Sequence, residues 1–161
     1  MSASSTVPST ARHGLSAPDA FTTAGAVVGL GCTLVGQFVQ TPWKSDRARW
    51  GVDFAGNGGW TTLLVLVAFV VVATMVVGLA TDRARAVPPE RAARRALVLA
   101  VLGAVTIAVF WTGVPAVLAG GAAGLALGTR RELGRLTAPA AVALAVVVLT
   151  VASAVYLAFT G

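Results

Sequence analysis

Few side chains in this chain are of types that carry chemistry, and their spacing does not assemble a reaction centre. Asp46 and Asp53 are the carboxylates of segment 41–59, where they could serve as acid and base in an enzyme acting on lipids. Neither has a histidine or a nucleophile beside it, since the only histidine is His13 and the only cysteine is Cys32. We therefore expect no catalytic residues, and the sequence favours a protein that is not an enzyme.

The same composition argues against the common metal and cofactor sites. One histidine cannot supply bis-histidine haem ligation or a zinc-protease motif, and one cysteine cannot form a cysteine-rich metal site or an intrachain disulfide. The glycine-rich runs lie within an apolar stretch rather than between a strand and a helix, so they do not predict a nucleotide site. We expect no metal and no cofactor, with Cys32 as a packing residue.

Five stretches contain no Asp, Glu, Lys, Arg or His and are apolar enough to enter a bilayer. They are residues 20–39, 60–80, 96–111, 114–128 and 138–159. Hydrophobic residues make up 57% of the chain and charged residues 11%, whereas a soluble domain has about 25% charged residues. Because the stretches lack the alternation of a barrel strand, the sequence predicts an all-α, polytopic transmembrane helical bundle over 20–160. A disordered cytoplasmic tail, 1–19, precedes it.

The third and fourth stretches are short for a membrane crossing, which takes about 20 residues. A turn at 112–115 separates them, so they form a tight hairpin that either crosses the bilayer twice or re-enters from one side. Proline after a capping position predicts helix starts at Thr41-Pro42, Pro88-Pro89 and Ala138-Pro139.

Positive charges sort the loops into two sides. With a cytoplasmic N-terminus and five crossings, nine cationic residues would lie inside and three outside, which gives an extracytoplasmic C-terminus in the cytoplasmic membrane. The charges flank membrane segments and form no nucleic-acid face, so anionic lipid headgroups are the expected partner. The expected lipid contacts are Arg83, Arg85, Arg91, Arg94, Arg95, Arg130 and Arg131.

Segment 41–59, expected outside the cell, concentrates aromatic residues. Trp43, Trp50 and Phe54 are seven and four residues apart and would share one face of an interfacial amphipathic helix. With Trp60 they would anchor the segment at headgroup level. The other interpretation is a lid or docking surface over the bundle, hinged by Gly56, Gly58 and Gly59.

Small residues at four-residue spacing predict close helix contacts. Gly120, Gly124 and Gly128 form one such row, and Gly25 with Gly29 forms a shorter one. These rows would pack either within the chain or against a partner. Thr33 and Gln37 lie on a small-and-polar stripe that would either bond between helices or line a solute path.

Two functions remain compatible with these observations. The sequence favours a non-catalytic multi-pass membrane protein, a packing or accessory subunit that self-associates or binds other membrane subunits. The alternative is a small oligomeric facilitator or pore for a neutral or apolar solute, lined by Thr33 and Gln37. The bias towards Ala, Val, Gly and Arg is typical of bacteria with GC-rich coding sequences.

Overall fold

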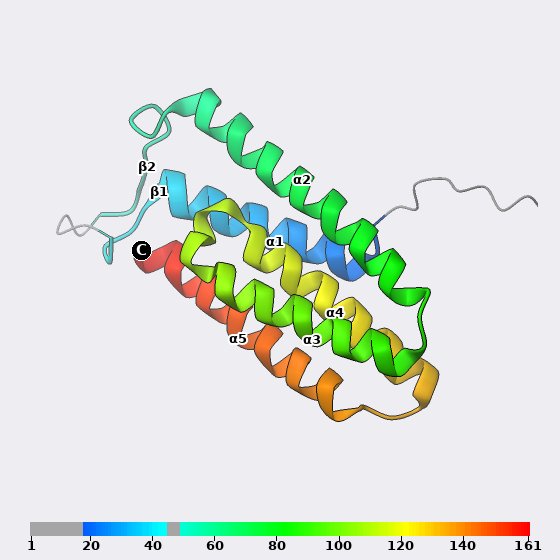
Figure 1. Cartoon of the computed structure of the whole chain (residues 1–161). Coiled ribbons are helices and arrows are strands. Elements are labelled where there is room, and N and C mark those ends of the chain that lie inside the picture. The colour runs from blue at the N-terminus through cyan, green and yellow to red at the C-terminus, as the bar shows by residue number, and fades with distance from the viewer. Residues whose placement is uncertain (1–17, 45–48) are drawn as a thin grey trace, which may run out of the picture.

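The described part of the chain, residues 18–44 and 49–161 of a computed structural model, forms five α-helices that run alternately up and down (Figure 1). They are α1 (Ala20–Phe38), α2 (Gly59–Arg85), α3 (Pro89–Val105), α4 (Val114–Leu133) and α5 (Ala138–Thr160). The 3-10 helix η1 (Thr106–Thr112) extends α3, and strands β1 (Val39–Gln40) and β2 (Gly51–Val52) pair between α1 and α2. The all-α expectation is confirmed.

Four of these helical stretches are long and apolar enough to cross a membrane: α1, α2, α3 joined to η1, and α5. Several apolar helices of this kind make the chain a membrane protein by composition. The stretch expected at 114–128 lies within α4, which is not apolar enough over its length to count among them. The reason is that α4 runs on through Arg130, Arg131 and Glu132 and contains four glycines, which lower its mean hydropathy.

Local sequence signals explain most helix starts. Pro89 is the first residue of α3 and Pro139 follows the first residue of α5, as the proline positions predicted. The expected start at Thr41-Pro42 is wrong, because these residues follow β1 and enter a turn. Instead α1 begins after Asp19, whose side chain accepts a hydrogen bond from the Thr22 amide at 2.8 Å.

The segment between α1 and α2 forms a β-hairpin where the aromatic spacing predicted a helix. Val39 pairs with Val52, and Gln40 pairs with Gly51. Gly58 and Gly59 have φ values of 83° and 53°, which most residues avoid, and they are the cap and the first residue of α2. The glycines and Pro42 disfavour a helix more strongly than three aromatic residues favour one.

The connection between α3 and α4 turns at the mid-length of α1. Gly113, with φ 72°, lies beside Gly29 and Thr33 of α1 and Val70 of α2. From Gly29 to the end of α1 at Phe38 is about 14 Å at 1.5 Å per residue. The glycine turn therefore lies below the end of α1, whereas Phe110, just before it in η1, reaches Gly36 of α1 and Gly161 at the end of the bundle where α1 meets the β-hairpin.

The last seven residues before this turn form η1 rather than the α-helix expected through Trp111. Thr106 turns its hydroxyl back to the carbonyl oxygen of Gly103 at 3.0 Å, and Val109 leaves helical geometry with φ −117° and ψ 39°. A 3-10 helix is tighter than an α-helix, and stretches longer than three or four residues are uncommon. Here it carries the chain into the glycine turn.

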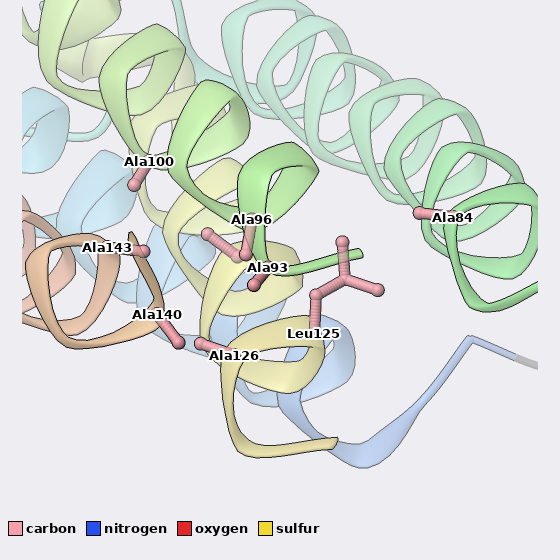
Figure 2. Packing of buried hydrophobic residues seen from close by; sticks show 9 residues of the cluster. Ala84, Ala93, Ala96, Ala100, Leu125, Ala126, Ala140 and Ala143 are labelled. Atoms are coloured by element: carbon pink, nitrogen blue, oxygen red, sulfur yellow. The ribbon is translucent and has the colours of Figure 1, made fainter. Parts of the chain in front are cut away.

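The centre of the bundle is α4, which contacts each of the other four helices. Its residues Val117, Ala119, Ala122 and Ala126 are fully buried. Figure 2 shows the cluster in which Leu125 and Ala126 of α4 face small side chains from α2, α3 and α5. The members of this cluster are Ala84, Ala93, Ala96, Ala100, Ala122, Leu125, Ala126, Ala140 and Ala143. Alanine side chains allow helix backbones to approach closely.

Charged residues collect at the two ends of the bundle. Eight arginines lie at the end where α1 and α5 begin, on α2, α3, α4 and the α4–α5 loop: Arg83, Arg85, Arg91, Arg94, Arg95, Arg130, Arg131 and Arg135. Four carboxylates accompany them: Asp19, Asp82, Glu90 and Glu132. We call this the arginine end. The opposite end, the hairpin end, carries Lys44, Arg49 and Asp53 among the described residues, together with the C-terminus (Figure 1).

Candidate functional site

The glycines of α1 lie against α4. A methyl group added to Gly25 would lie 2.5 Å from the carbonyl oxygen of Ala116 and 3.0 Å from the Cα of Gly120. One added to Gly29 would lie 2.6 Å from the carbonyl oxygen of Gly113. Such distances leave no room for a side chain, so the α1–α4 contact is made by backbone atoms.

The remaining residues of the predicted row on α4 are not equivalent. Gly124 faces the carboxylate of Asp19, whereas Gly128 has no heavy atom within 4 Å of an added methyl group. Gly121, which was not singled out from the sequence, faces Val77 and Thr81 of α2. Gly120 thus packs against α1 and Gly121 against α2 within the same chain, whereas Gly128 packs against neither.

Thr33 and Gln37, the residues of the predicted solute path, differ in burial and in contacts. Thr33 is fully buried, and its hydroxyl donates to the carbonyl oxygen of Gly29 in its own helix at 2.6 Å. An added methyl group on Gly113 would lie 2.9 Å from the same hydroxyl oxygen. Gln37 is half-buried near the hairpin end of α1. The cavities described below are lined by other residues.

The aromatic residues of the hairpin form two separate groups. Trp43 and Trp50 contact each other edge to face, with ring centroids 5.6 Å apart, and both are more than half exposed. Phe54 lies 5.0 Å from Phe38 and 5.3 Å from Trp60, again measured between ring centroids. The first group faces outwards, and the second joins the ends of α1 and α2.

Asp53 holds the turn between β2 and α2. Its carboxylate accepts hydrogen bonds from the Gly56 amide at 2.8 Å and from the Gln40 side chain at 3.4 Å. Its backbone carbonyl oxygen accepts one from Asn57. Asp46 and His13, the other residues considered for chemistry, lie outside the described residues. The contacts of Asp53 are those of a turn residue.

Lys44, the single lysine of the chain, caps the end of α1. Its ammonium group donates to the carbonyl oxygens of Val35 at 3.1 Å, Gly36 at 2.8 Å and Val39 at 3.2 Å. The last carbonyls of a helix lack partners within the helix and carry partial negative charge. Burial lowers the pKa of Lys44 below its ordinary value. No local sequence signal predicts this contact, because it depends on the path of the hairpin.

Two further contacts connect parts of the chain that are distant in sequence. The Thr41 hydroxyl donates to the carbonyl oxygen of Phe159 at 2.5 Å, which joins the hairpin to the end of α5. At the other end of the bundle, Arg85 forms an ion pair with Asp19, which joins the end of α2 to the start of α1. Neither pair is visible from local spacing, since the partners are 118 and 66 residues apart.

The seven arginines expected to contact anionic lipid all lie at the arginine end. Arg85 also lies 3.9 Å from Asp82, and the Arg95 side chain donates to the backbone carbonyl oxygen of Arg83 at 3.0 Å. These contacts bring the end of α2 together with α1 and α3. The described residues of this end carry twice as many arginines as carboxylates, so its surface is positive.

An apolar groove of about 570 Å³ lies between α1 and α2. Its lining residues lie within 18–30 and 70–79, so it occupies the half of these helices nearer the arginine end. A second cavity, of about 50 Å³, lies at the arginine end beside Arg85, Thr129 and Glu132. The larger groove has the volume of a site for a small molecule or a lipid chain, about 300–1,000 Å³.

Among the described residues, no group of three or more His, Cys, Asp or Glu side chains is placed to hold a metal ion. The arrangement combines close-packed helices, two charged ends and an apolar groove. Protein-family models, curated proteins and solved structures were all compared with the chain, and none matches it.

Proposed function

We propose that this chain is a non-catalytic multi-pass membrane protein that acts as a packing or accessory subunit of a membrane complex, or of an assembly of its own copies. The observation that carries the proposal is the position of α4. In a small bundle the centre is where a pore or reaction site would lie, and here Val117, Ala119 and Ala122 fill it with close helix contacts. A solute path through one chain would have to displace α4.

The bundle would sit in the cytoplasmic membrane with its arginine end inside the cell. The positive-inside rule supports this orientation, because eight described arginines lie at one end, whereas Lys44 and Arg49 lie at the other. The N-terminus would be cytoplasmic and the hairpin and C-terminus extracytoplasmic. Trp43, Trp50 and Trp60, all exposed, would lie at headgroup level on the outer side.

The α3–α4 hairpin would be re-entrant: α3 would enter the bilayer from the arginine end, the chain would turn at Gly113, and α4 would return to the same side. The position of Gly113 beside Gly29 and Val70 supports a turn within the outer half of the bilayer, because α1 extends about 14 Å beyond this level. A membrane-impermeant thiol reagent applied to whole cells tests this. We expect slow labelling of Thr112→Cys and rapid labelling of Trp43→Cys, both in a Cys32→Ala background. Equal rates would indicate a full crossing.

Association with a partner would use the outer side of α2. This helix lies along one side of the bundle against α1 and α4 (Figure 1). Its opposite side exposes four large apolar residues, Val65, Phe69, Val72 and Val76. Their spacing of four, three and four residues forms one continuous face, on which a second helix could pack.

Cross-linking in native membranes tests this role. We expect a cysteine at Val72, in a Cys32→Ala background, to give a disulfide or bismaleimide product larger than the monomer. A cysteine at Val148, equally exposed on α5, is the matched control and should give none. A product of twice the monomer mass indicates self-association, and a product of another mass indicates a different subunit. Monomer alone from Val72→Cys in membranes from the native host contradicts the proposal.

A further inference from the structure

The α1–α2 groove has the chemistry of a hydrocarbon site. Its polar lining side chains are Thr23 and Thr74, and the Thr74 hydroxyl already donates to the carbonyl oxygen of Val70 at 2.7 Å. Val27 and Met75 line the groove and are 67% and 62% exposed, so the groove opens sideways to the surroundings of the bundle. A ligand here would enter from the bilayer and would be apolar over the length of the groove.

The length of the groove distinguishes between apolar ligands. Along α2 it runs from Val70 to Leu79, about 14 Å at 1.5 Å per residue. This is about half of the 30 Å hydrocarbon core, so the groove spans a single leaflet. A transmembrane partner helix crosses both leaflets, so the groove would hold only part of its length. A lipid acyl chain needs one leaflet only.

The charge at the end of the groove distinguishes between lipids. Pro18 closes this end by packing on Gly78, and the groove-lining face of α2 continues through Asp82 to Arg85. Asp19 and Asp82 accompany Arg85, which is partly exposed at this end of the groove, whereas Arg83 is exposed on another face of α2. The surrounding arginine end carries eight arginines against four carboxylates among its described residues. A negative headgroup is therefore favoured over a zwitterionic one.

We propose that the α1–α2 groove binds one acyl chain of an anionic phospholipid from the leaflet at the arginine end, with the headgroup beside Arg85. The proposal rests on membrane insertion of the bundle, which its apolar helices support. It does not depend on the accessory role, because the groove is formed by one chain and lies on a different side of α2 from Val72 and Val76.

Native mass spectrometry of the delipidated full-length protein tests the proposal, with palmitoyl-oleoyl phosphatidylglycerol and phosphatidylcholine as the two probes. We expect the first phosphatidylglycerol to bind several-fold more tightly than phosphatidylcholine. Thr74→Phe, which fills the groove, should abolish this tight binding. Val76→Phe, which adds an aromatic ring to α2 outside the groove lining, should leave it unchanged. Arg85→Gln should reduce the preference for phosphatidylglycerol and retain binding of a lipid.

A second readout covers the case in which Thr74→Phe fails to fold. Phosphatidylglycerol with a photoreactive acyl chain should label wild-type peptides containing Thr23 or Met75 in preference to the α5 peptide containing Val148. Met75→Trp, a change at an exposed rim position, should reduce that labelling. Equal binding of both lipids by wild type and all variants, or uniform labelling of α2 and α5, would overturn the proposal in favour of an ordinary lipid annulus. Displacement of the lipid by a co-purifying protein cross-linked at Met75 would also overturn it.

Discussion

Gly25 of α1 and Gly120 of α4 contact each other through their backbones. An added methyl group on Gly120 would lie 2.9 Å from the Cα of Gly25 and 3.1 Å from its amide nitrogen. The two helices meet here as closely as their main chains allow. This contact connects the first helix of the chain to the helix at the centre of the bundle.

Substitution of these glycines by alanine should destabilise the bundle. We expect Gly25→Ala and Gly120→Ala each to cost about 1–3 kcal/mol, because the helices must separate to admit the methyl group. The measurement is thermal unfolding of the purified protein in detergent, followed by tryptophan fluorescence. Gly128→Ala is the control, since it adds a methyl group to the same helix in open space and should stabilise it by up to about 1 kcal/mol. Similar destabilisation by all three changes would contradict this account.

Gly113 and Gly134 allow the cost of backbone strain to be separated from the cost of crowding around an added methyl group. Gly113 and Gly134 both have positive φ, 72° and 66°, but Gly134 has no heavy atom within 4 Å of an added methyl group. Gly134→Ala should cost only the strain of a left-handed residue, about 1–2 kcal/mol. Gly113→Ala also places a methyl group too close to Thr33 and Val70, so it should lower the free energy of unfolding by more in the same measurement. If the two variants are equally stable, the turn is not held against α1 and α2 as described.

The Asp19 carboxylate has two roles that substitutions can separate. Asp19→Asn retains a helix cap for Thr22 and removes the charge that pairs with Arg85. We expect Asp19→Ala to cost about 1 kcal/mol more than Asp19→Asn, which is the usual value of an N-cap. The ion pair itself should contribute about 0.2–1 kcal/mol, because Arg85 is partly exposed, and should weaken as salt is added. A double-mutant cycle with Arg85→Gln measures it, and a coupling energy of zero at low salt would show that the pair does not stabilise the bundle.

Lys44 should titrate below an ordinary lysine. Because it is the only lysine, ¹³C-methylation reports its pKa by NMR, with the N-terminal amine as the one other signal. Burial makes its charged form less favourable in the folded protein, so the unfolded chain holds the proton to higher pH. Stability should therefore rise with pH between the folded and unfolded pKa values of Lys44. Lys44→Met should remove this pH dependence, and a folded pKa at or above the unfolded value would contradict the burial shown here.

Much of the secondary structure could be predicted from the sequence because charges mark its limits. Arg83, Pro89 and Pro139 fall at or near helix ends, where charge and proline are tolerated. The central position of α4 could not be predicted in the same way. In a membrane the lipid-facing and buried faces are both apolar, so hydrophobicity does not tell them apart. The spacing of Gly25 and Gly120 indicated close packing and did not indicate that these two residues would face each other.

The candidate sites were less predictable than the helices. The groove between α1 and α2 consists of ordinary apolar residues such as Val27 and Met75, and it exists only because these two helices lie side by side. Segment 41–59 was assigned a helix from the spacing of Trp43, Trp50 and Phe54, but a seven-residue spacing also occurs when a chain reverses in a hairpin. Its glycines were the more informative signal.

The central place of α4 has a consequence for the biogenesis of the protein. The translocon admits helices largely one by one according to their apolarity, and α4 with its glycines and terminal arginines is the helix least suited to enter alone. Its neighbours include α5, which is synthesised after it. Under the proposed membrane insertion of the bundle, α4 would reach a stable position in the bilayer only after α5 is made, and a ribosome-stalled or truncated product without α5 should be recognised by membrane quality-control proteases.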